Sequence, residues 1–66
     1  MEIRLNGNPH TLDGPATVAE LLASLELTPA SVAVAVNEEV VPRAVHGNRT
    51  LKAGDRVEII QAVAGG

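Results

Sequence analysis

The chain has 66 residues, a formal net charge of −3, no cysteine, and no phenylalanine, tyrosine or tryptophan. Without cysteine it can form no disulfide bond, thiolate metal site or cysteine nucleophile. The five Lys and Arg residues are scattered and no ring is available for base stacking, which argues against nucleic-acid binding. No apolar run approaches the roughly 18 residues of a membrane span, and no signal-peptide pattern is present. We expect one cytoplasmic domain over residues 1–66, with a core of Val, Leu, Ile and Ala.

Two strands joined by a tight turn are expected at the start of the chain. Apolar and charged side chains alternate over residues 1–5, which is typical of a half-buried strand. Asn6-Gly7 is a strong hairpin signal because both residues tolerate positive φ. Residues 8–12 would form the returning strand, and Pro9, which has no amide hydrogen, places that strand at an edge of the sheet.

A helix of about ten residues is expected next, because apolar side chains recur at the spacing of one helical face. These side chains are Val18, Leu21, Leu22 and Leu25. Thr17 and Glu20 form the capping-box pattern at the start of the helix. Thr28-Pro29 prevents its continuation, since the residue before proline avoids the helical region. A helix this short does not persist alone, so we expect it to pack on the sheet.

Two further strands are expected in the middle of the chain. Valine and alanine alternate strictly over residues 32–36, with the valines toward the core. A turn at residues 37–39 leads to a short strand at residues 40–41, which Pro42 stops.

The last strand is expected at residues 56–61, with Val57 and Ile59 facing inward. Residues 43–49 show no clear period, and residues 50–51 fit one more short strand. The whole series predicts an α+β fold in which one helix crosses one face of a mixed sheet of four to five strands. This arrangement buries one apolar face of each element.

The sequence contains no set of residues that fits a catalytic centre. His10 and His46 lie far apart in sequence, so we expect both to be solvated and no metal site to form. Glu38-Glu39 lies in a turn, where a charged pair is ordinarily solvated. No loop has the glycine, lysine and hydroxyl spacing of a phosphate-binding loop. We therefore expect no enzyme activity and no bound cofactor, and a partner would have to bind any ATP that its chemistry uses.

Ile60 breaks the expected pattern of the last strand. It has the parity of Glu58 and should face away from the core. If the last strand neighbours residues 32–36, Ile60 joins Ala33 and Ala35 in a shallow apolar patch near Arg4 and Glu58. Such a patch suggests docking of a partner, whereas a single exposed isoleucine is also common and carries no function.

Small side chains and two glycines close the sequence. Side-chain size falls from Val63 through Ala64 to Gly65 and Gly66. Glycine has no Cβ and can enter a slot too narrow for a side chain. The group presented there is an α-carboxylate, which is ionised and weakly nucleophilic at neutral pH. We interpret the rest of the chain as a handle for this carboxylate, the alternative being a frayed end of small residues.

Several short segments together resemble the ubiquitin-like β-grasp sulfur carriers and, more closely, the ThiS family of thiamine biosynthesis. They are Val34-Ala35-Val36-Asn37, Val40-Val41-Pro42-Arg43, residues 51–59 and Val63-Ala64-Gly65-Gly66. The resemblance covers the whole chain and is most specific in its second half. One departure is visible, since the family often has a Trp shortly after the Pro-Arg pair, where this chain has Val45-His46.

The resemblance implies a β-grasp fold with a central last strand and a flexible tail at residues 62–66. It implies that an E1-like, ATP-using adenylyltransferase activates Gly66 while Val63, Ala64 and Gly65 thread into the partner's active site. Sulfur from a donor system of the cysteine desulfurase type would then give a thiocarboxylate, which passes its sulfur to thiazole synthase. An extended tail of five residues reaches about 16 Å, enough to enter a buried site.

Three alternatives remain open from the sequence. The first is the related small subunit that delivers sulfur to the molybdenum cofactor, which the lack of aromatic residues and the Pro42-Arg43 pair disfavour. The second is a ubiquitin-like modifier conjugated to lysine side chains. The third is a β-grasp interaction module whose C-terminus is inert.

Overall fold

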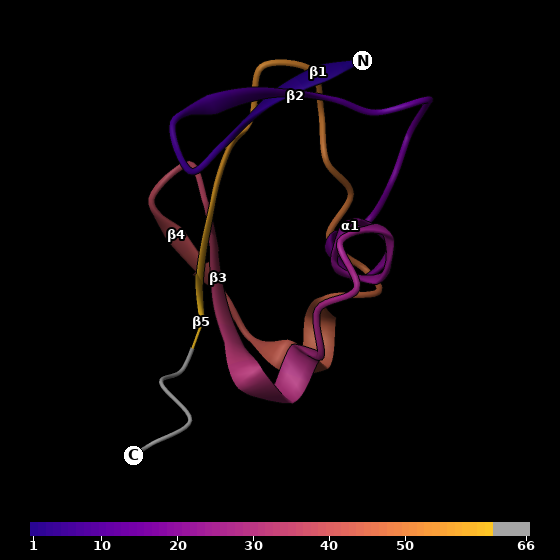
Figure 1. The fold of residues 1–66 in the computed structure, drawn as a ribbon. Helices are drawn as coiled ribbons and strands as arrows, with labels where there is room; N and C mark the ends of the chain where they lie inside the picture. Colours follow the sequence, from indigo (N-terminus) through magenta and orange to yellow (C-terminus); the bar gives the residue numbers. More distant parts are fainter. Residues whose placement is uncertain (62–66) are drawn as a thin grey trace.

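The computed structural model describes residues 1–61 and shows one α-helix across one face of a five-stranded mixed sheet (Figure 1). Two short 3₁₀ helices, η1 and η2, lie in the connections. The predicted α+β fold is confirmed, with five strands. The elements are β1 (Glu2–Leu5), β2 (Asn8–Thr11), α1 (Val18–Ser24), η1 (Pro29–Ser31), β3 (Val32–Val36), β4 (Glu39–Val41), η2 (Arg43–Val45) and β5 (Arg56–Gln61).

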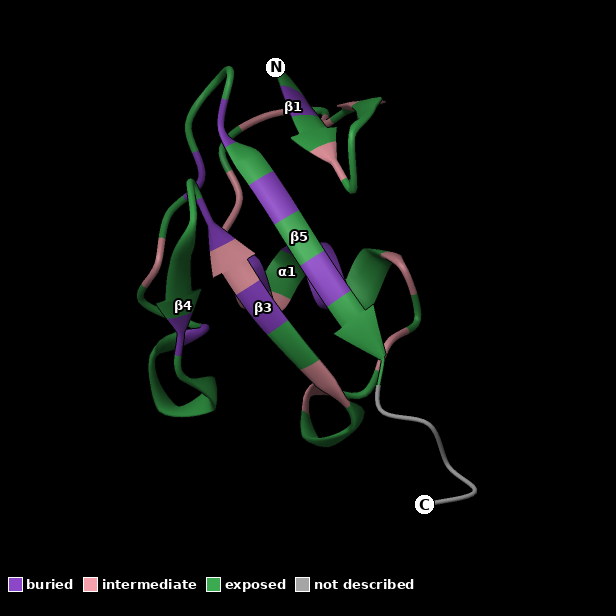
Figure 2. Ribbon diagram, turned by 90° about the vertical axis from the view of Figure 1, so that its left-hand side faces the viewer, coloured by how far each residue is buried: buried purple, intermediate pink, exposed green. Residues whose placement is uncertain are grey.

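The last strand, β5, lies at the centre of the sheet, whose order is β2-β1-β5-β3-β4. It pairs in parallel with β1 and antiparallel with β3. β2 lies at an edge of the sheet, as Pro9 predicted, because proline has no amide hydrogen to donate to a second neighbouring strand. The other face of the sheet carries no helix in the described part of the chain, and Figure 2 looks onto it with α1 behind β3 and β5.

Both tight turns of the sheet use left-handed backbone. Asn6 and Gly7 have φ of 51° and 85°, and Asn37 and Glu38 have φ of 52° and 70°. Two consecutive positive φ angles match the right-handed twist of the flanking strands. The second turn is one residue shorter than predicted, because Glu39 pairs with Val36 and begins β4.

Helix α1 begins as predicted and ends earlier. The hydroxyl of Thr17 accepts a hydrogen bond from the Glu20 amide at 3.2 Å, and the Glu20 carboxylate accepts one from the Thr17 amide at 2.8 Å. The helix has seven residues rather than about ten, because Glu26 turns left-handed with φ of 59°. The Leu27 amide then donates to the Leu22 carbonyl at 2.9 Å, which is the Schellman way of ending a helix.

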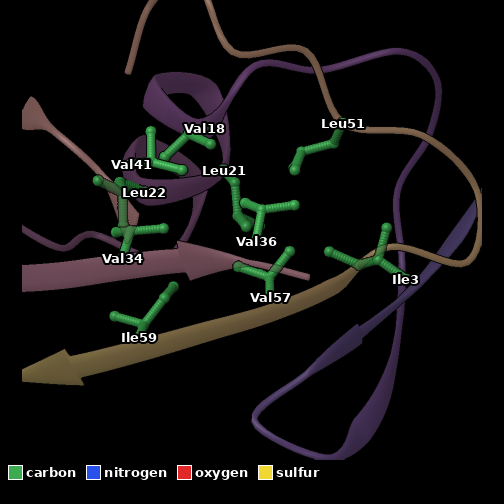
Figure 3. Close-up of a cluster of buried hydrophobic side chains, with 10 residues drawn as sticks. All are labelled: Ile3, Val18, Leu21, Leu22, Val34, Val36, Val41, Leu51, Val57 and Ile59. Carbon is green, nitrogen blue, oxygen red and sulfur yellow. The ribbon is translucent and has the colours of Figure 1, made fainter. Parts of the chain in front are cut away.

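The core lies between α1 and the sheet (Figure 3). It contains only aliphatic side chains, as the composition required, and the valines of β3 face inward as predicted. Aliphatic burial is the main favourable contribution to the stability of so small a domain. The ten buried members are Ile3, Val18, Leu21, Leu22, Val34, Val36, Val41, Leu51, Val57 and Ile59.

The connection from β4 to β5 differs from the prediction. Residues 50–51 form no strand; Thr50 makes one isolated bridge to Thr17, and Leu51 is buried in the core. The irregular stretch begins with η2 and then contacts the start of α1, where the Val18 amide donates to the Arg49 carbonyl at 2.9 Å. No helix within residues 1–61 has the length and hydrophobicity needed to cross a membrane.

Candidate functional site

Strand β5, which leads into the predicted tail, pairs with β1 at residues 56–57 and with β3 along residues 57–61. Val32 of β3 lies opposite Gln61, the last described residue, so the register extends to the end of β5. The predicted tail residues, Val63, Ala64, Gly65 and Gly66, lie outside the described residues. The sheet therefore fixes the point from which the chain continues beyond residue 61.

Two asparagine side chains complete the hydrogen bonding of β5. Asn6 Oδ1 accepts from the Ile59 amide at 2.8 Å, and Asn6 Nδ2 donates to the Ile59 carbonyl at 3.2 Å. At the start of the strand, Asn37 Oδ1 accepts from the Arg56 amide at 2.9 Å, and Asn37 Nδ2 donates to Asp55 Oδ1 at 3.0 Å. The sequence predicted both asparagines as turn residues and gave no signal for these contacts.

The predicted docking residues come together on the open face of the sheet. Ile60 is 68% exposed and lies opposite Ala33, and Ala35 lies opposite Glu58. The parity assigned to Ile60 is confirmed, since Ile59 beside it is buried and the buried and exposed bands of β5 alternate in Figure 2. These residues line a shallow hollow of about 370 Å³, together with Val34, Glu38 and Val40.

Val40 is a member of this face that the sequence prediction missed. It is 74% exposed and lies opposite Ala35. Because successive residues of a strand face opposite sides, the inward position of Val41 was the signal that would have placed Val40 outward. Arg4 lies in a second hollow, of about 300 Å³, with Gly7, Arg56, Val57 and Glu58.

The prediction that both histidines are solvated is wrong. His46 is buried, with Nε2 lying 3.1 Å from the Val41 carbonyl oxygen and Nδ1 without a hydrogen-bond partner. The turn after η2 brings His46 inward, and the Ala19 amide of α1 donates to its carbonyl at 3.0 Å. His10 is half-buried in β2.

The acidic residues of the described chain do not converge on one point. Within residues 1–61, no three His, Cys, Asp or Glu side chains gather in a way that could hold an ion. Glu38 and Glu39 are both exposed, as predicted. The buried carboxylate of Asp55 accepts hydrogen bonds from Asn37 and from the Lys52 amide, so it supports the turn before β5.

The model of the ThiS family matches residues 3–66 of the chain. The sulfur carrier protein ThiS of Escherichia coli is 33% identical over 66 residues, which cover all of both chains. A crystal structure of the thiamine biosynthesis protein ThiS from Geobacter metallireducens superposes with a TM-score of 0.84 at 39% identity, covering all of both chains.

Similarity also extends to longer proteins. A thiazole synthase of Magnetococcus marinus is 38% identical over 66 residues, which are all of this chain and 20% of that protein. A thiazole synthase of Paramagnetospirillum magneticum is 32% identical over the same fraction. The chain thus spans about a fifth of the length of these two relatives. With the family model matching almost its whole length and the same fold in a ThiS crystal structure, this chain belongs to the ThiS family.

Proposed function

We propose that this chain is the sulfur carrier of thiamine biosynthesis and that it carries sulfur on the α-carboxylate of Gly66. The match to the ThiS family over residues 3–66, which includes Gly65-Gly66, is the observation that carries the proposal. The E. coli relative with the same span is named a sulfur carrier protein. The chain would then be a protein co-substrate on which partner enzymes act.

The chemistry at Gly66 requires activation by a partner. Carboxylate oxygen is a poor leaving group, so an ATP-using, E1-like adenylyltransferase would first transfer AMP to the carboxylate and release pyrophosphate. A partner persulfide, loaded by a donor system of the cysteine desulfurase type, would displace AMP and form an acyl disulfide with Gly66. A second partner thiol would then cleave the S–S bond, which releases the thiocarboxylate and leaves a disulfide on the partner. The chain itself would bind no cofactor. Two terminal glycines suit this role because neither presents a side chain to the activating site.

The described fold supports this role through the central position of β5. Its register with β3 extends to Gln61, so the residues after it, Val63, Ala64 and Gly65, would enter the partner's active site from a fixed starting point. We propose that the partner docks on the open face around Ile60, Ala33 and Ala35. An exposed apolar hollow next to the point where the tail begins is typical of an interaction surface.

The acceptor of the sulfur would be a thiazole synthase. Two proteins of that name contain a region similar to this whole chain, which supports a functional link between carrier and synthase. We place the reaction in the cytoplasm, where the activating enzyme would have access to ATP.

The direct test combines the chain with its cognate activating enzyme, ATP and sulfide. We expect ATP–pyrophosphate exchange that depends on the chain, followed by the mass increase that corresponds to replacing one oxygen with one sulfur. Fragmentation should place that sulfur on Gly66. An interaction module with an inert terminus would give neither exchange nor a mass change, and a lysine-conjugating modifier would give larger conjugates.

A further inference from the structure

The hollow of about 370 Å³ around Ile60, here called the docking hollow, is lined by apolar side chains and by two carboxylates. Its lining includes the small side chains of Ala33 and Ala35 and the carboxylate residues Glu38 and Glu58. Glu38 comes from the turn between β3 and β4, and Glu58 comes from the middle of β5. Within the described residues 1–61, both glutamates are exposed to solvent.

This combination restricts what can cover the hollow. A purely apolar side chain would gain from contact with Val40 and Ile60 but would take both carboxylates out of water without a partner. Removing an unpaired charge from water is strongly unfavourable. A lysine or arginine side chain meets both requirements, because its aliphatic stem can lie on an apolar surface while its charged end reaches a carboxylate.

We propose that the partner inserts a lysine or arginine side chain into this hollow, with the aliphatic stem over Ala33 and Ala35 and the cationic end toward Glu38 and Glu58. The inference rests on the proposed function, because the partner meant is the activating enzyme. The chain has a formal net charge of −3, so it would also be attracted to a partner surface that carries lysine and arginine side chains.

Two arginines lie close enough to require consideration. Arg4 and Arg56 are paired in the register of β1 and β5, and they share the second hollow with Glu58. Both arginines are exposed, and Arg4 Nη1 donates to the Gly7 carbonyl at 3.3 Å. Neither lines the docking hollow, so they leave the side of Glu58 that faces Ile60 open to a cation from the partner.

The chain offers a matched control for the test. Glu39 follows Glu38 directly and is exposed, but it pairs with Val36 and lies on the side of the sheet away from the hollow. Glu26 is also exposed and lies after α1. The double variants Glu38→Gln/Glu58→Gln and Glu26→Gln/Glu39→Gln therefore have equal charge and differ in whether the hollow is affected.

The measurement is the dissociation constant of each variant with the activating enzyme, by fluorescence or calorimetric titration. Each titration is run at about 0.01 M and at about 0.15 M salt, because the Debye length falls from about 30 Å to about 8 Å between these concentrations. For Glu38→Gln/Glu58→Gln we expect binding weakened about tenfold or more at low salt and a smaller salt dependence than wild type. The control pair should stay within about twofold of wild type, because exposed charges away from the contact act only through weak, screened interactions.

Equal effects of the two double variants, or tighter binding by Glu38→Gln/Glu58→Gln, would overturn the inference, and the second result would indicate an apolar occupant. Thermal melting of both variants checks that the fold is retained. Wild-type ATP–pyrophosphate exchange separates the two proposals. Absence of exchange with the wild-type chain would contradict the carrier function. Normal wild-type exchange, together with an unchanged dissociation constant for Glu38→Gln/Glu58→Gln, would contradict only the proposal that a lysine or arginine fills the hollow.

Discussion

Asn6 and Ile59 exchange two hydrogen bonds, at 2.8 and 3.2 Å, across 53 positions of sequence. β1 turns away at Gly7, which would leave the Ile59 backbone without a neighbour on that side. The Asn6 amide supplies the missing donor and acceptor in the way that a neighbouring strand would. The central strand is thus held on both sides at Ile59, two residues before the end of the described chain.

Replacing Asn6 should therefore destabilise the domain through its side chain. Asn6→Gly allows the left-handed backbone and removes the side-chain hydrogen bonds, and the new glycine also makes the unfolded chain more flexible. We therefore expect the free energy of unfolding to fall by about 1–3 kcal/mol. Thermal or urea unfolding measures this change. Asn48→Ala is the control, since Asn48 is exposed in a loop, and it should change stability by no more than about 0.5 kcal/mol. Equal stability of the two variants would show that the Asn6 side chain contributes nothing.

The capping box of α1 gives a second prediction. Thr17→Ala removes the hydroxyl that accepts from the Glu20 amide, and we expect a loss of about 1 kcal/mol. For a domain of this size that corresponds to roughly 4–8 °C in the melting temperature. Thr28→Ala is the matched control, because Thr28 precedes η1 without any side-chain capping hydrogen bond. A melting temperature lowered equally by both changes would argue against the cap.

Ile59 and Ile60 provide the sharpest separation of fold from docking. Ile60 is 68% exposed and Ile59 is 8% exposed. Ile60→Asp should leave the melting temperature nearly unchanged and weaken binding to the activating enzyme by about 2 kcal/mol or more. Ile59→Asp should lower stability by more than about 3 kcal/mol, because it buries an unpaired charge. Circular dichroism and binding titrations measure the two effects, and a severely unfolded Ile60→Asp chain would contradict the assignment of its face.

The features that sequence could predict were those with local causes. Side chains of a strand alternate with period two, so the inward Val57 and Ile59 and the outward Ile60 followed from spacing alone. Thr17 and Glu20 are three positions apart and cap the helix by themselves. Pro9 lacks a donor and therefore could lie only at an edge.

The features that sequence missed depend on contacts between distant segments or on strained backbone. The helix ends where Glu26 adopts positive φ, and glutamate carries no such signal, unlike glycine. His46 is buried because the turn after η2 packs against α1, which its neighbours in sequence do not indicate. The contact between Asn6 and Ile59 exists only once β5 lies beside β1.

The central claim is that the α-carboxylate of Gly66 is the reactive group. Deleting Gly66, or adding one residue after it, moves that carboxylate by roughly 3.5 Å along the chain. A misplacement of about 1 Å can already lower a rate about a hundredfold, so we expect both variants to lose ATP–pyrophosphate exchange. Gly65→Ala keeps the carboxylate in position and adds one methyl group, so it should show a milder defect.

The decisive measurement is ATP–pyrophosphate exchange by the chain lacking Gly66, with the cognate activating enzyme and with circular dichroism as the control for folding. We predict an unchanged spectrum and melting temperature, because the buried core of the described chain involves no residue after Ile59, together with no exchange above background. Exchange at the wild-type rate in that variant would contradict the role of Gly66 and, with it, the proposed function of the chain as a sulfur carrier.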